Sequence, residues 1–178
     1  MDAKEIYLWC VKEDGLSEKQ FSSLTPVEQS VLEKGAGGKY RLNARNRSRF
    51  KVVLTGGVFD ILHIGHVLTL QKARGLGDLL VVVVTTDGRV EQVKKRKPIH
   101  TADYRCAMVS SIRSVDLAIV GADEVMKTFE RVKPDVVAFG YDQKPFGLPA
   151  QCKSVHLREI KADESLAKTS KIIRELGL

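Results

Sequence analysis

From residue 51 onward, short apolar runs alternate with amphipathic stretches. The stretches at 64–76, 101–112 and 123–132 repeat apolar residues at helical spacing and predict three helices. Four consecutive valines, Val81 to Val84, are typical of a strand covered on both faces, as in a parallel sheet. Runs of this kind, rich in β-branched residues, predict five strands, at 51–55, 79–86, 115–120, 135–140 and 153–158.

The alternation of strand and helix, without an internal sequence repeat, predicts an α/β fold. We expect a Rossmann-like, doubly wound, five-stranded parallel sheet over residues 49–178. Ligands of such sheets bind beyond the carboxyl ends of the strands. The loops that follow the strands are therefore where binding and catalytic residues are expected.

Residues 1–48 follow a different pattern and predict a small N-terminal extension of helix and strand. Thr25, Pro26 and Glu28 form the signature of a capped helix start, and a glycine-rich turn and a short basic strand follow. A winged-helix unit contains such a succession, but so do many other folds. The purpose of this extension stays open.

The composition fits one domain of ordinary size with a small appendage. The chain has 178 residues, 43% hydrophobic and 29% charged. It contains no run of eighteen apolar residues, and acids interrupt its first apolar stretch, so we expect a cytoplasmic protein without a membrane span or secretory signal. Cys10, Cys106 and Cys152 lie far apart and form no CxxC pair, which argues against both a disulfide framework and a zinc site.

A formal net charge of +7 indicates an anionic partner without identifying it. The cations gather in two segments, "KKRKP" at 94–98 and a basic arm at 34–51 that contains no acid. A solvated surface would show the same pattern. The cations of the basic arm are Lys34, Lys39, Arg41, Arg45, Arg47, Arg49 and Lys51.

The string "TGGVFDILHIGH", residues 55–66, joins the first predicted strand to the first predicted helix. Its glycines let the backbone approach a ligand, and the start of the helix presents free N–H groups and a positive dipole to an anion. His63 and His66 are three residues apart and share a helix face, so both imidazoles would face the same anion. The string therefore predicts a phosphate site.

Two other interpretations of the histidine pair remain. In an isolated HxxH, one histidine often caps the helix while the other packs in the core. A zinc site is less well supported, because the HExxH glutamate is missing and no further His/Cys cluster completes four ligands.

The surrounding residues resemble a known signature. "GGVFDILHIGH" is similar to the GTFDxxHxGH motif of the nucleotidyltransferase superfamily, which includes cytidylyltransferases, FAD synthases and pantetheine-phosphate adenylyltransferases. The resemblance implies that His63 and His66 stabilise the α- and β-phosphates, and that Val58 belongs to the nucleotide-binding loop. The motif residues that agree are Gly57, Phe59, Asp60, His63, Gly65 and His66.

The resemblance extends along the chain. It implies that Lys94, with a catalytic role, and Lys97 hold phosphates, that Arg105 and Arg113 give charge support, and that Asp116 is a structural acid near the interface of a homodimer. The "FGYDQ" loop would line the base side of the pocket, and "KTSK" would open the last helix and bind the β- and γ-phosphates. The residues implied for these two segments are Gly140, Tyr141, Asp142 and Gln143, and Lys168, Thr169 and Ser170.

The implied reaction transfers a nucleotidyl group from a nucleoside triphosphate to a phosphate-bearing small molecule, with Mg²⁺ held mainly by substrate oxygens and water. Glycerol-3-phosphate cytidylyltransferases carry GDDW and RTxGISTT, whereas this chain has "GYDQ" and "ESLAKTSK". It looks closer to archaeal-type FAD synthases, which join the AMP of ATP to FMN, although it lacks the cysteines that this family tends to carry near its last motif. A CTP-dependent cytidylyltransferase acting on an alcohol phosphate is the alternative.

A hypothesis of another class is a non-catalytic regulator that binds nucleotides, or nucleic acid through the basic arm. Few aromatic residues interleave that arm, so base stacking has little support. A dinucleotide-dependent oxidoreductase is disfavoured, because no GxGxxG follows the first strand.

Overall fold

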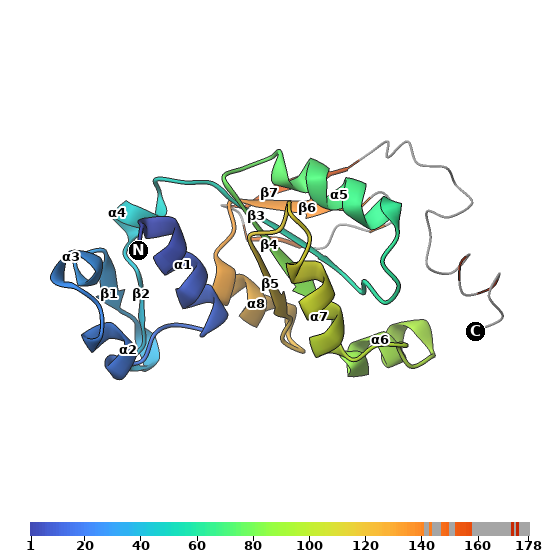
Figure 1. The fold of residues 1–178 in the computed structure, drawn as a ribbon, viewed down its shortest axis with the longest axis horizontal. Coiled ribbons are helices and arrows are strands. Elements are labelled where there is room, and N and C mark those ends of the chain that lie inside the picture. The colour runs from blue at the N-terminus through green and yellow to red at the C-terminus, as the bar shows by residue number, and fades with distance from the viewer. Residues whose placement is uncertain (141–142, 144–146, 150–151, 158–171, 173, 175–178) are drawn as a thin grey trace.

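A five-stranded parallel sheet forms the centre of the computed structural model, which describes residues 1–140, 143, 147–149, 152–157, 172 and 174 (Figure 1). The strand order is β5-β4-β3-β6-β7, and every neighbouring pair is parallel. Each strand overlaps one of the predicted apolar runs, so the predicted fold is confirmed. The bounds are β3 Val52–Gly57, β4 Leu79–Val84, β5 Leu117–Val120, β6 Val136–Phe139 and β7 Lys153–His156.

Helices follow three of these strands. The predicted helices correspond to α5 Ile64–Arg74, α7 Ala102–Ser110 and α8 Val125–Val132. Sequence reasoning missed α6, Asp87–Lys94, which has a single buried residue, Val90, and therefore little apolar periodicity.

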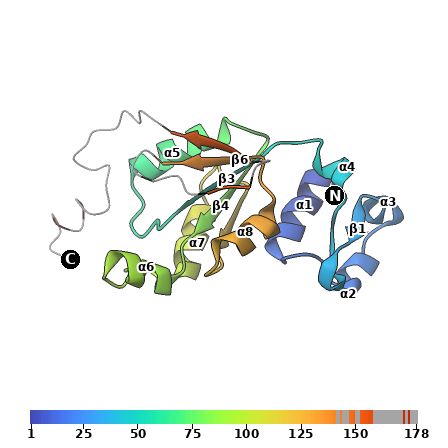
Figure 2. The same cartoon turned by 180° about the vertical axis from the view of Figure 1, so that it is seen from behind.

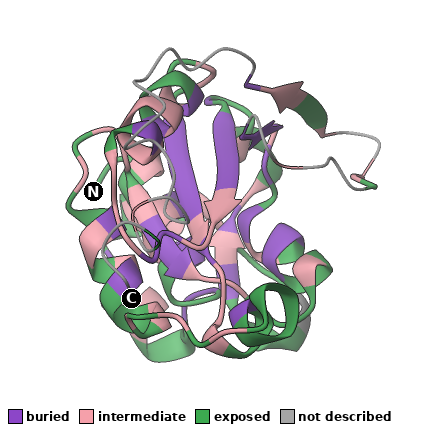
Figure 3. Ribbon diagram, turned by 90° about the vertical axis from the view of Figure 1, so that its right-hand side faces the viewer, coloured by how far each residue is buried: buried purple, intermediate pink, exposed green. Residues whose placement is uncertain are grey.

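The two faces of the sheet belong to two hydrophobic clusters, because successive side chains of a strand point to opposite faces. Val53, Leu80 and Val82 pack with Leu70 of α5 and Val109 of α7. The other face, with Val52, Leu54 and Val81, packs against α1 and α8. Figure 3 accordingly shows the central strands largely buried, whereas β7 is exposed to half-buried and the outer sides of the helices are exposed.

The N-terminal extension contains three helices, a β-hairpin and a further helical turn. Thr25 caps α3, with Glu28 completing the capping box as predicted. The antiparallel hairpin joins β1 to β2 through a turn that includes the 3₁₀ helix η1. The bounds are α1 Ala3–Lys12, α2 Glu18–Ser22, α3 Pro26–Gln29, β1 Leu32–Lys34, η1 Ala36–Gly38, β2 Tyr40–Leu42 and α4 Ala44–Arg47.

Helix α1, which the sequence analysis did not predict, attaches this extension to the sheet. Ile6, Tyr7 and Val11 lie in the same cluster as the strand residues, and α1 lies beside α8 in both views (Figure 2). The Tyr7 hydroxyl donates to the Val132 carbonyl at 2.7 Å, and Arg131 donates to the Val11 carbonyl at 2.6 Å. The extension thus shares a core with the sheet. None of the helices in the described residues is long and apolar enough to cross a membrane.

Candidate nucleotide site

The predicted phosphate motif lies at the point where the sheet reverses its winding. From β3 the chain proceeds to β4 and β5 on one side, and then places β6 and β7 on the other. Ligands of doubly wound sheets bind at this reversal, beyond the carboxyl ends of the strands. Gly57 ends β3 there, and the motif loop leads directly into α5.

The structure brings His63 and His66 together. His63 is the N-cap residue of α5 and His66 lies in its first turn; their ring centroids are 3.8 Å apart and the rings are nearly parallel. The N-cap residue of α5 makes no side-chain cap hydrogen bond, so within the described part of the chain the N–H groups of Ile64 and Gly65 can bind an anion. The two imidazoles and the helix start therefore form one potential phosphate-binding surface.

The environment of His66 keeps its ring neutral. Burial, and then the neighbouring His63, lower the pKa of His66 to about 4. Its Nδ1 is buried and has no hydrogen-bond partner among the described residues, so Nε2 is the ring nitrogen that can reach a ligand. A neutral imidazole with a proton on Nε2 donates one hydrogen bond to a phosphate oxygen.

Phe59 and Gly57 shape the backbone beside the histidines. Phe59 is buried and has a positive φ of 53°, which is strained for a residue with a side chain. Its ring packs against His66, with centroids 5.0 Å apart, and a Cβ at Gly57 would approach that ring to 3.0 Å. Glycine at position 57 therefore allows the aromatic ring to support His66.

Asp60 connects the motif to the basic segment 94–98. Its carboxylate, 1% exposed, accepts hydrogen bonds from the backbone N–H groups of Ile99 and His100 and from Arg96 at 2.8 Å. Burial raises the pKa of Asp60, but Arg96 and the two N–H groups outweigh burial and hold the pKa below its usual value. The sequence analysis assigned no role to Arg96 or His100. The one signal that could have indicated them is the acid Asp60 within the motif, which needs hydrogen-bond donors when buried.

The predicted site residue Arg105 is engaged by groups of the protein itself. Its side chain is 0% exposed, and its guanidinium donates to the Val58, Thr85 and His100 carbonyls and to the Asp87 carboxylate, at 2.6 to 2.9 Å. These acceptors engage all three of its nitrogens, and a role of Arg105 in supporting the charge of a bound nucleotide stays a prediction. Arg105 joins the loops that follow β3 and β4 to the start of α7.

The predicted site residue Arg113 lies away from the histidine motif within one chain. Helix α7 runs back toward the amino end of the sheet, and Arg113 lies in the turn that leads into the first residue of β5, Leu117. Nearby Asp116 accepts a hydrogen bond from the Leu80 N–H and pairs with Arg74 at 3.0 Å, which fits a structural acid. Within one chain, Arg113 is therefore at the opposite edge of the sheet from His66.

The two predicted lysines lie in the segment that Asp60 anchors. Lys94 is the last residue of α6 and Lys97 follows Arg96, and both are exposed. At the end of β6, the buried Gly140 donates its N–H to the side chain of Gln143 at 2.8 Å. The predicted residues Tyr141, Asp142, Lys168, Thr169 and Ser170 lie outside the described residues.

A protein cage for a metal ion is not formed by the described residues, where no three His, Cys, Asp or Glu side chains gather. The carboxylate of the motif itself, Asp60, is engaged by Arg96 and two backbone N–H groups.

A family model described as cytidylyltransferase-like matches residues 54–173, which include the whole strand-to-helix motif. The chain belongs to the cytidylyltransferase-like family. An FAD synthase from Thermococcus sibiricus is 39% identical over 136 residues, 70% of this chain and 90% of that protein. Another from Aciduliprofundum boonei is 55% identical over 93 residues, 52% of this chain but only 62% of that protein.

A solved structure supports the fold of this cytidylyltransferase-like chain. The crystal structure of the lipopolysaccharide core biosynthesis protein from Thermoplasma volcanium aligns with a TM-score of 0.59 and 37% sequence identity. The alignment covers 63% of this chain and 99% of the other.

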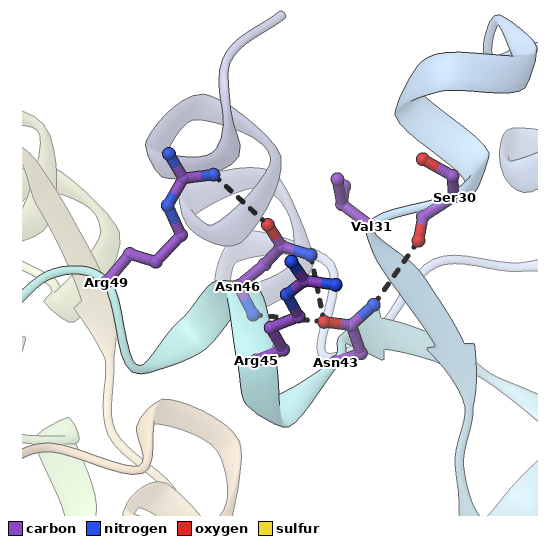
Figure 4. A pocket seen from close by; sticks show the side chains of 6 residues that line it. All are labelled: Ser30, Val31, Asn43, Arg45, Asn46 and Arg49. Atoms are coloured by element: carbon purple, nitrogen blue, oxygen red, sulfur yellow. Dashed lines mark hydrogen bonds between the residues drawn. The ribbon is translucent and has the colours of Figure 1, made fainter.

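The basic arm lies outside the residues that match the cytidylyltransferase-like family, and protein oxygens engage most of its cations. Three form ion pairs with acids, and Lys39 donates to the Glu13 and Asp14 carbonyls. Arg45 and Arg49 line a hollow of about 740 Å³ together with Ser30, Val31, Asn43 and Asn46, and Arg49 also donates to the Asn46 side-chain oxygen at 3.4 Å (Figure 4). The three ion pairs are Lys34–Glu18, Arg41–Asp14 and Arg47–Asp135.

Proposed function

We propose that this chain is an FAD synthase, which transfers AMP from ATP to FMN and produces FAD and pyrophosphate. The observation that carries the proposal is the stacked pair of His63 and His66 at the uncapped start of α5, at the reversal of the sheet. The choice of substrates rests on relatives named FAD synthase that align over 90% of their length at 39% identity.

In the proposed reaction, a phosphate oxygen of FMN attacks the α-phosphorus of ATP. The bond between that phosphorus and the oxygen bridging to the β-phosphate breaks, and pyrophosphate leaves. No covalent enzyme intermediate is needed, since such transfers depend on alignment of the reactants and stabilisation of charge in the transition state.

The imidazoles provide donors where negative charge develops. His66, neutral in the free protein because its pKa is about 4, donates from Nε2 to an oxygen of the α- or β-phosphate. His63 binds the same group from the adjacent ring, and the N–H groups of Ile64 and Gly65 add the positive end of the helix. Removing one such donor typically costs about 10²–10³ in rate.

The remaining roles follow from the resemblance to the family. Lys94 and Lys97 bind phosphate groups of the nucleotide and the acceptor, and the loop of Gly140, Tyr141 and Asp142 lines the base side. Lys168, Thr169 and Ser170 bind the leaving pyrophosphate. Bound Mg²⁺ neutralises part of the charge of the triphosphate.

A substrate panel tests this proposal. The protein is incubated with Mg²⁺ and either ATP or CTP, each with FMN, glycerol-3-phosphate, phosphocholine or phosphopantetheine, and pyrophosphate is measured. We expect pyrophosphate with ATP and FMN only, together with stoichiometric FAD. Release with CTP and an alcohol phosphate would instead establish the cytidylyltransferase alternative.

A further inference from the structure

The pairing of β3 with β6 ends before the pairing of β3 with β4. Backbone register with β4 continues to Gly57, whereas register with β6 stops at Leu54 opposite Val137. Beyond that point side chains bridge the two strands. The first bridge is the buried Thr55 hydroxyl, which donates to the Ala138 carbonyl at 2.8 Å.

Gln143 forms the second bridge, nearest to the ligand edge. Its Nε2 donates to the Gly56 carbonyl of β3 at 2.7 Å, while its Oε1 accepts from the Gly140 N–H after β6 at 2.8 Å. Its own carbonyl oxygen lies 3.1 Å from Nε2 of His156, at the end of β7. One residue thus connects the carboxyl ends of three strands.

This bridge lies at the reversal of the sheet, where ligands of doubly wound sheets bind. The backbone pairing of β3 with β6 has ended there, and we call this unpaired stretch the opening between β3 and β6. Gly56 on one side leads into the histidine motif, and Gly140 on the other begins the loop expected at the nucleotide base. Because the amide uses both a donor and an acceptor, it fixes the spacing and the orientation of these two backbone segments. A side chain of equal length without polar atoms would fix neither the spacing nor the orientation of these segments.

We infer that Gln143 is a positioning residue for the nucleotide: by holding Gly56 and Gly140 at a set spacing, its amide gives the opening between β3 and β6 the width that the nucleotide requires. Gln143 acts through the backbone of β3 and β6. The inference rests on the proposed function only in naming ATP as that nucleotide.

The test compares Gln143→Met, which keeps the length of the side chain, with Gln143→Ala, which shortens it. The Kd of the non-reactive analogue α,β-methylene-ATP is measured by calorimetry, and the KM of FMN by pyrophosphate release. We expect both variants to weaken analogue binding by about tenfold, the loss of one to two hydrogen bonds, while the KM of FMN stays within about twofold.

Thr55→Val is the matched control, because it also removes a side-chain bridge between β3 and β6 but within the core. It should lower the Tm and leave the Kd of the analogue unchanged. Wild-type binding by Gln143→Met would overturn the inference, as would equal weakening by Thr55→Val, since a general loss of stability would then explain both.

Failure of the proposed function has a different signature. If wild-type protein turns over CTP rather than ATP, the FAD synthase proposal fails, and the same variants are measured with α,β-methylene-CTP. If the wild type binds neither analogue, both proposals fail.

Discussion

The basic arm and the carboxyl edge of the sheet are both rich in cations, but they use them differently. In the arm, Lys34, Arg41 and Arg47 form ion pairs with acids of the same chain. At the sheet edge, Arg96 and Arg105 are also engaged by protein oxygens. The groups beside them that can face a phosphate are the His66 imidazole, the N–H groups at the start of α5 and the exposed Lys94 and Lys97.

This difference shows that the density of charge in a sequence does not locate a binding site. Buried or half-buried cations in this chain mainly connect loops, because a charged group removed from water needs partners. The start of α5 contributes to the candidate phosphate site groups that are neutral or partially charged, which are buried at lower cost and still donate hydrogen bonds.

The largest expected effect comes from removing the donor at the sheet edge. His66→Ala should lower kcat by about 10²–10³, because a donor to the transition state is lost. His66→Phe serves as the second variant, since it keeps an aromatic ring against Phe59 and His63 while removing the N–H. Steady-state kinetics with a Tm for each variant check this, and full activity of a folded His66→Phe protein would exclude His66 from the mechanism.

The second effect distinguishes a structural arginine from a phosphate ligand. Arg105→Met should reduce the free energy of unfolding by about 3 kcal/mol, because its buried acceptors lose their donor. Arg113 is exposed and lies in the turn between α7 and β5. Arg113→Met should therefore change the free energy of unfolding by less than about 0.5 kcal/mol. Urea unfolding measures both. Unchanged stability of Arg105→Met, together with a raised KM for ATP, would support the nucleotide-binding role that the resemblance implies.

The smallest effect is expected in the basic arm. Arg45→Gln combined with Arg49→Gln should leave turnover unchanged, since both residues lie in the hollow of the N-terminal extension. If the arm binds nucleic acid, the logarithm of the association constant should depend less steeply on the logarithm of the salt concentration in the double variant than in the wild type. The slope should differ by at most about two, one for each cation removed. Binding titrations at several salt concentrations check this. Loss of turnover in the double variant would contradict the separation of the two regions.

Much of the fold follows from local patterns. The apolar runs of the parallel strands and the capping residues of α3 are visible in the sequence because each element carries its own signal. Helix α6 was missed because only Val90 is buried. Residues that act within their own loop, such as His63 and His66, were paired correctly from their spacing.

Roles that depend on contacts between residues far apart in the sequence could not be predicted from local patterns. A motif match placed Arg105 and Arg113 near phosphates, but it contains no information on which carbonyls engage a guanidinium or at which end of a helix a residue lies. The contacts of Asp60 with Arg96 and of Gln143 with Gly56 join residues 36 and 87 positions apart. Such contacts exist only in the folded chain.

The titration of His66 by NMR, with and without α,β-methylene-ATP, tests most directly whether its imidazole binds the triphosphate. In the free protein, burial and His63 disfavour the charged ring, so the pKa should be about 4 and the ring neutral above about pH 5. The bound anion favours the charged ring, so the pKa should rise by at least about one unit. The signal is assigned by its absence in His66→Phe. A pKa that is the same in the presence and absence of the analogue would contradict the account.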